Sequence, residues 1–226
     1  MMAIANIEMA IRAIADGNMI IVTDDEDREN EGDLILAAEA ATPEKIAFMV
    51  RYTSGVICAA LPADRLALLR LPLMLADNTE SMRTAFTITV DYRHGTSTGI
   101  SAADRAATMR ALVDPNVGAE DFARPGHVFP IRAAPGGVLE RRGHTEAAVD
   151  LTRLAGLTPG GVICEIVNDD GTMARRPNLQ AFAATHGLIM ITIADLVRYR
   201  ARNDTSSKPL STGPGLRLSR NRVRFA

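Results

Sequence analysis

The sequence has 226 residues, of which 47% are hydrophobic, 23% are charged and only 4% are aromatic, with no tryptophan. This is an ordinary globular composition with enough apolar material for one large domain or two small ones. The net charge of −2 and the scarcity of aromatic rings argue against nucleic acid or an anionic membrane as the main partner, because those partners select basic surfaces and stacking rings.

Targeting and redox features point to the cytoplasm. The first 17 residues, MMAIANIEMAIRAIADG, contain Glu8 and Asp16 and lack the basic n-region of a signal peptide. No stretch approaches the roughly 18 apolar residues that cross a bilayer. Cys58 and Cys164 lie far apart in apolar runs, and two cysteines cannot form a four-thiolate zinc site, so we expect reduced, buried thiols.

Helix and strand patterns mix along the chain. Caps and stops mark several helices: Gly17 ends the first, Thr42-Pro43 starts the second, and Ser101-x-x-Asp104 opens a later one. In chain order we expect helix 6–15, strand 18–23, strand 34–38, helix 42–54, strand 56–60, short helix 62–69, irregular chain 71–83, strand 85–91, helix 101–113, strand 127–132, helix 144–155, strand 161–167, helix 178–186, strand 188–192 and helix 192–202.

These elements predict an α/β protein of the α+β type. They lack the strict alternation of a doubly wound sheet, and the sequence has neither a GxGxxG nor a GxxxxGK[ST] motif. We expect a single compact domain over residues 1–203, with a mixed sheet surrounded by helices. Residues 204–226 are rich in Arg, Ser, Pro and Gly and are expected to form a flexible tail.

Residues 24–33 read DDEDRENEGD and carry a local charge of −6, which leaves +4 for the rest of the chain. Seven carboxylates in ten residues repel one another unless water or a cation neutralises them. An exposed charged loop is one explanation. A binding loop is favoured because the run follows a buried strand, because Gly32 permits unusual backbone conformations, and because Arg28 and Asn30 interleave hydrogen-bonding groups.

The spacing Asp25-x-Asp27-x-Glu29 begins like an EF-hand. However, Asn30 stands at loop position six, where glycine is required, and Leu36 stands at position twelve, where glutamate is required. A Mg²⁺ site built from one or two carboxylates, water and substrate fits better.

Three further segments carry groups suited to binding or proton transfer. The RRGHT segment at 141–145 begins a helix and forms either a phosphate cradle or a basic surface turn. His127 follows Pro-Gly and is either a general base or a structural histidine. Glu165 lies in an apolar strand, where a carboxylate is costly to bury unless it is paired or functional. The hydroxyl-rich segment 96–101 caps a helix and could also bind an anion.

Together these segments resemble the 3,4-dihydroxy-2-butanone 4-phosphate synthases of riboflavin biosynthesis. The acidic motif combined with RPGHVFP is very specific for that family. The matching motifs follow the family's order over roughly residues 6–200: DDEDRENEGD at 24–33, STGISAADR at 97–105, RPGHVFP at 124–130, GHTEA at 143–147 and NDDGTMA at 168–174.

The resemblance implies a lyase that converts D-ribulose 5-phosphate to L-3,4-dihydroxy-2-butanone 4-phosphate and formate. The implied route is enediolate formation, dehydration, skeletal rearrangement and loss of C4. The resemblance also implies Mg²⁺ or Mn²⁺, with two ions per active site, and no organic cofactor. It further implies a homodimer with active sites near the subunit interface.

The resemblance assigns roles residue by residue. The implied metal ligands are Glu29 and His144, and the implied proton-transfer residues are His127 and Glu165. The implied substrate contacts, including the phosphate site, are Arg28, Glu29, Asp33, Thr98, Arg141, Arg142, Gly143, His144, Thr145 and Glu165. The other acids of the run form a surrounding shell whose individual roles stay open: Asp24, Asp25, Glu26, Asp27 and Glu31.

Two features depart from the family pattern. Many members have Gly at the position of Arg142, so this side chain either strengthens phosphate binding or points to solvent. Some relatives are fused to GTP cyclohydrolase II, but the chain after Arg202 is too short for that domain. We therefore expect a single activity.

Two other function classes stay open. A metal-dependent sugar-phosphate isomerase or aldolase would share the phosphate site, the metal and the base, and product analysis would separate it. A non-catalytic module would use the acidic loop only to hold a cation. In such a module, Glu165→Gln would change nothing measurable.

Overall fold

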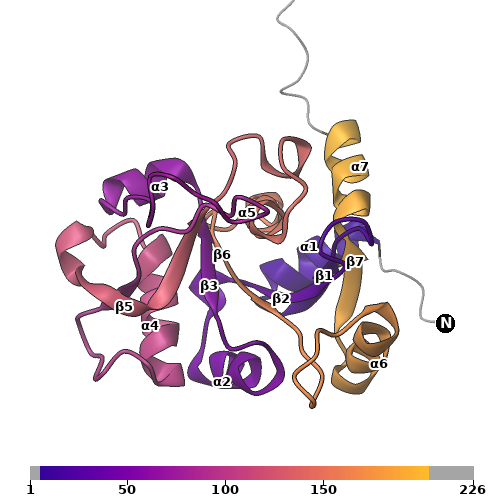
Figure 1. Ribbon diagram of the computed structural model, residues 1–226, viewed down its shortest axis with the longest axis horizontal. Helices are drawn as coiled ribbons and strands as arrows, with labels where there is room; N and C mark the ends of the chain where they lie inside the picture. The colour runs from indigo at the N-terminus through magenta and orange to yellow at the C-terminus, as the bar shows by residue number, and fades with distance from the viewer. Residues whose placement is uncertain (1–5, 204–226) are drawn as a thin grey trace, which may run out of the picture.

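A mixed sheet of seven strands runs through the computed structural model, which describes residues 6–203 (Figure 1). The expected tail at 204–226 lies outside the described residues. The strand order is β4-β5-β3-β6-β2-β1-β7, in which β1–β7 and β3–β5 are parallel pairs and the others antiparallel. The strands are β1 (Ile20–Thr23), β2 (Gly32–Ala37), β3 (Cys58–Leu61), β4 (Val90–Tyr92), β5 (Phe122–Arg132), β6 (Gly161–Glu165) and β7 (Ile189–Thr192). The predicted mixed sheet is confirmed.

Seven α-helices cover the two faces of the sheet in the described residues. They are α1 (Ile7–Ala15), α2 (Pro43–Tyr52), α3 (Ala63–Leu68), α4 (Ala102–Val113), α5 (His144–Leu154), α6 (Arg176–His186) and α7 (Ile193–Asn203). Three short 3₁₀ helices occupy Ala38–Ala40, Ala119–Asp121 and Gly137–Leu139. Within residues 6–203, no helix combines the length and hydropathy that crossing a bilayer requires.

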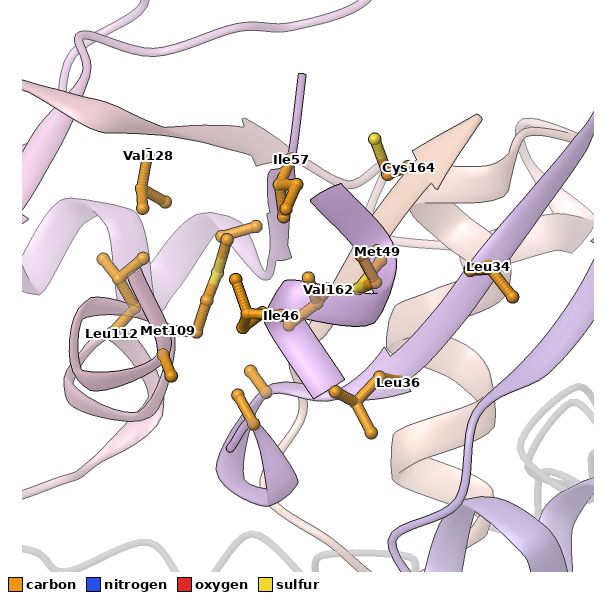
Figure 2. Packing of buried hydrophobic residues seen from close by; sticks show 14 of the residues in the cluster. Leu34, Leu36, Ile46, Met49, Ile57, Met109, Leu112, Val128, Val162 and Cys164 are labelled. Atoms are coloured by element: carbon orange, nitrogen blue, oxygen red, sulfur yellow. The ribbon is translucent and has the colours of Figure 1, made fainter. Parts of the chain in front are cut away.

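Two hydrophobic cores form because successive strand residues point to opposite faces of the sheet. Leu34 and Leu36 of β2 pack with α2, α4 and α6, and Figure 2 shows them with Met49 and Leu112 in this core. Ile35 of β2 faces the other side, where α1, α5 and α7 pack. Strands buried on both faces explain the nearly continuous apolar runs in the sequence.

The capping signals set most helix boundaries as predicted. The Asn6 side chain accepts a hydrogen bond from the Glu8 N–H, Thr42 caps α2, and Ser101 caps α4 through the Asp104 N–H. The predicted strand at 85–91 is wrong over most of its length, because the regular strand β4 begins only at Val90. Before it, Phe86 forms an isolated bridge with Ile131, and Thr87 forms one with Leu73. The segment leads into the edge strand of the sheet, which has a strand neighbour, β5, on one side alone in the described residues.

Gly126, beside His127 in β5, is packed directly against the backbone of β4. A Cβ atom there would lie 2.0 Å from the Val90 carbonyl carbon and 2.3 Å from the Asp91 nitrogen. Only glycine allows the two strands to approach this closely.

We therefore expect Gly126→Ala to destabilise the fold by about 1–3 kcal/mol or more, because backbone atoms must move to admit the methyl group. Urea unfolding monitored by circular dichroism measures the change. Gly118→Ala is the matched control, since the nearest atom to its added Cβ would lie 3.8 Å away. Equal stability of the two variants would show that the β4–β5 contact tolerates a side chain.

Candidate active site

The acidic loop joins β1 to β2 and is organised by the Asp24 carboxylate. The Asp24 side chain is only 1% exposed. It accepts hydrogen bonds from the backbone N–H of Glu29 at 3.0 Å and of Glu31 at 2.9 Å, and from Arg28 Nη1 at 2.9 Å. Three donors on one carboxylate fold the loop back on its own start, and Asn30 at the turn has a left-handed φ of 54°.

Asp24, Glu29 and His144 bring one ligand atom each to within 4.8 Å of one another. His144, the first residue of α5, is buried, and its Nδ1 lies 3.6 Å from Glu29 Oε2 and 3.7 Å from Asp33 Oδ1. Its Nε2 and the Asp33 Oδ1 are buried without a hydrogen-bond partner among the described residues. A divalent cation fits these carboxylate and imidazole donors and would satisfy groups that are otherwise costly to bury.

The charges of this cluster shift its titration. The His144 imidazole, whose Nδ1 lies 3.6 Å from Glu29 Oε2, and the nearby Arg28 cation lower the pKa of Glu29 against the effect of burial. Burial raises the pKa of Asp33 to about 7. Burial alone would lower the pKa of His144, but the nearby Asp33 and Glu29 carboxylates together raise it to about 9. The cluster therefore holds a proton near neutral pH in the place where a cation would bind.

Glu165 ends β6 directly opposite Asp33 of β2. Its carboxylate accepts a hydrogen bond from the Ser54 hydroxyl at 2.7 Å, and its backbone carbonyl accepts one from the Ser54 N–H at 2.8 Å. Burial and the neighbouring Glu29 raise the pKa of Glu31 on the same side of the loop. Four carboxylates therefore converge here from β2, β6 and the acidic loop.

The RRGHT segment places one arginine over the start of α5. Arg141 Nη1 donates to Glu146 Oε2 at 2.8 Å, and its Nη2 donates to the Met82 carbonyl at 3.2 Å. The guanidinium packs closely on Gly143, since a Cβ there would lie 2.3 Å from Arg141 Nη1. Thr145 is buried in the first turn of α5, and Arg142 is exposed. The helix start offers N–H groups and one arginine to an anion.

His127 belongs to a second group of residues. Its Nδ1 donates to Asp91 Oδ2 at 2.7 Å, and its backbone N–H donates to Asp91 Oδ1 at 2.8 Å. An ionised carboxylate only accepts, so Nδ1 carries the hydrogen and Nε2 is free to act as the base. Gly99 packs on this pair, since a Cβ there would lie 2.0 Å from Asp91 Oδ2. Thr98 therefore sits on the loop beside His127.

Strand register relates the two groups. Cys58 of β3 pairs with Phe129 of β5 and with Ile163 of β6. His127 and Glu165 each lie two residues from that row, toward the same end of the sheet. With β3 between them, their backbones are on the order of 10 Å apart at a spacing of about 4.8 Å per strand.

The structure thus brings Arg28, Glu29, Asp33, His144 and Glu165 together, and it places Thr98 on the loop beside His127. Sequence reasoning did not single out Ser54 or Asp91, because neither stands in a matching motif. It left Asp24 in the acidic shell, although the donors that follow it in the loop were a usable signal. Cys58 and Cys164 are free and buried, as expected.

A family model described as 3,4-dihydroxy-2-butanone 4-phosphate synthase matches residues 8–199. A protein of that name from Agrobacterium fabrum is 63% identical over 198 residues, which cover 88% of this chain and 93% of the relative. The riboflavin biosynthesis protein RibBA of Salinispora arenicola is 61% identical over 90% of this chain, and the match spans 49% of that longer protein.

Solved structures of proteins with the same name are also similar to this chain. A crystal structure of 3,4-dihydroxy-2-butanone 4-phosphate synthase in complex with two magnesium ions is 45% identical, with a TM-score of 0.86 over 88% of this chain and 98% of that one. The enzyme of Candida albicans is 53% identical, with a TM-score of 0.83 over the same shares of the two chains.

We expect the affinity for Mg²⁺ to rise as the pH is raised from 7 toward 9. A metal ion bound through His144 would need the neutral imidazole, and the pKa of this group is raised to about 9, so below that value each pH unit should strengthen binding by up to about 10-fold. Isothermal titration at pH 7, 8 and 9 measures this dependence. His144→Gln should weaken binding and flatten the pH dependence. An unchanged affinity across this range in the wild-type protein would remove His144 from the ligand set.

Proposed function

The chain belongs to the 3,4-dihydroxy-2-butanone 4-phosphate synthase family, and on that premise we propose how its residues carry out the reaction. It is a lyase of riboflavin biosynthesis that converts D-ribulose 5-phosphate to L-3,4-dihydroxy-2-butanone 4-phosphate and formate. We assign the residues from one observation. Asp24, Glu29 and His144 converge beside Asp33 and Glu165, which pair across strands β2 and β6.

Glu29 and His144 hold the magnesium of this site. The lowered pKa of Glu29 keeps its carboxylate ionised, and the unpartnered Nε2 of His144 is buried among the described residues beside it. The ion supplies Lewis acidity to the carbonyl and hydroxyl oxygens of the substrate. We propose two ions per site, in keeping with the relative's structure in complex with two magnesium ions, and we propose that Mn²⁺ can replace Mg²⁺. Asp24 acts by holding the loop.

The substrate lies between the acidic loop and the start of α5. Arg28 and Asp33 contact its hydroxyl groups, while Arg141, Gly143 and Thr145 take its phosphate. The N–H groups and positive dipole end of α5 favour an anion there. Thr98 completes the phosphate site from the loop beside His127. Arg142 is exposed, which supports a place at the solvent edge of this site.

Proton transfers at several carbons require more than one acid–base group. Glu165 serves as one, and its carboxylate is oriented by the Ser54 hydroxyl at 2.7 Å. His127 serves as the other through Nε2, because Asp91 fixes the Nδ1–H tautomer at 2.7 Å. Together they remove the C3 proton, assist departure of the C1 hydroxyl and return a proton to C1. The carbon skeleton then rearranges, and C4 leaves as formate after hydration.

We also propose that the protein forms a homodimer with active sites near the subunit interface, and that it works in the cytoplasm. Exposed apolar side chains border both groups of site residues: Val56 is 47% exposed two residues after Ser54, and Ile100 is 51% exposed next to Gly99. Apolar groups exposed at the rim of a polar site support a second subunit there.

Purified protein with Mg²⁺ should release one formate for each D-ribulose 5-phosphate consumed. EDTA should abolish release and added Mg²⁺ should restore it, because the substrate oxygens need the cation. Proton NMR of the products measures formate directly. Pentulose or aldol products without formate would instead identify the isomerase or aldolase class.

Glu165→Gln and His127→Ser should each lower kcat by about 100-fold or more while magnesium affinity stays near the wild-type value, since each variant removes an acid–base group and no metal ligand. Steady-state kinetics and metal titration measure the two effects. Glu44→Gln, at an exposed acid in the first turn of α2, is the matched control. Unchanged turnover in either variant would remove that residue from the mechanism.

A further inference from the structure

Arg175, the residue that precedes α6, reaches across to the acidic loop. Its Nη1 donates to the backbone carbonyl of Glu29 at 2.9 Å and also to that of Asn30. The same nitrogen lies 4.0 Å from Glu31 Oε1. One cation from a distant segment therefore contacts three successive residues of the loop, residues 29–31.

These contacts lie on the opposite side of the loop backbone from the Asp24 contacts. The Asp24 carboxylate takes the N–H groups of Glu29 and Glu31, and Arg175 takes the carbonyls of Glu29 and Asn30. Peptide groups bonded on both sides cannot rotate freely, so the left-handed φ of 54° at Asn30 and the direction of the Glu29 side chain are fixed together.

The backbone at Arg175 is held by hydrogen bonds on both sides. Its backbone N–H donates to Asn178 Oδ1 at 3.2 Å in the cap of α6. The N–H of Ala174 donates to the Ile166 carbonyl at 2.9 Å, directly after Glu165. The guanidinium therefore links the acidic loop to the strand that carries Glu165.

We infer that Arg175 is a positioning residue, which holds residues 29–31 so that the Glu29 carboxylate is set for the divalent cation. The inference rests on the proposed metal site. The positive charge of Arg175 also offsets repulsion among the loop carboxylates, which would otherwise drive the loop open in the absence of metal. Groups that orient a metal ligand from outside the coordination shell commonly contribute about 10-fold or more to metal affinity.

The test is Mn²⁺ binding to the full chain, followed by electron paramagnetic resonance, with thermal unfolding measured alongside. Arg175→Met keeps the length of the side chain and removes the guanidinium, so Mn²⁺ affinity should fall by about 10-fold or more. Arg175→Lys, which keeps the charge, should regain part of it. Arg12→Met is the matched control, because Arg12 is an exposed arginine of α1, and the affinity of this variant should stay close to wild type.

Wild-type Mn²⁺ affinity in folded Arg175→Met protein would overturn the inference. If that variant does not fold, Arg175→Gln decides in the same way, with weaker binding supporting the inference and unchanged binding overturning it. Glu29→Gln separates this test from the proposed function. If Glu29→Gln also binds Mn²⁺ like wild type, the metal site itself is wrong.

Discussion

Mutual repulsion among the carboxylates of the acidic loop is the constraint that the surrounding structure resolves. The Asp24 side chain is buried and accepts hydrogen bonds from three donors. The Arg28 guanidinium forms ion pairs with Asp24 and Glu29. Glu29 is then left facing His144. Because the Asp24 carboxylate accepts two backbone N–H groups of the loop, Glu29 can face His144 beside Asp33 without the loop unfolding.

Strand pairing determines which chemical groups meet at that centre. The antiparallel pairing of β2 with β6 sets Asp33 against Glu165, and the order β5-β3-β6 brings His127 to the same end of the sheet. The start of α5 adds His144 and the N–H groups that we propose bind phosphate. The groups proposed for acid–base, metal and anion functions thus come from separate elements that share one end of one sheet, as is common for α/β proteins.

Local signals allowed much of the fold to be predicted, because caps such as Asn6, Thr42 and Ser101 act within one helical turn. Motif resemblance located Glu29 and His144, which the structure brings together. Contacts between distant segments could not be predicted in the same way. Ser54 reaches Glu165 across 111 residues of sequence, and such a meeting depends on strand order, which no local pattern encodes.

The parallel pairing of β1 with β7 joins the start of the described chain to its end, with Ile20 beside Ile189 and Thr23 beside Thr192. During synthesis on the ribosome, β1 must therefore wait for almost all of the described chain to emerge before its second neighbour is available. Until then one edge of the β1–β2 hairpin has unpaired N–H and carbonyl groups. Because long-range pairings are slow to form, the strand that leads into the acidic loop is among the last parts of the sheet to be completed in a nascent chain.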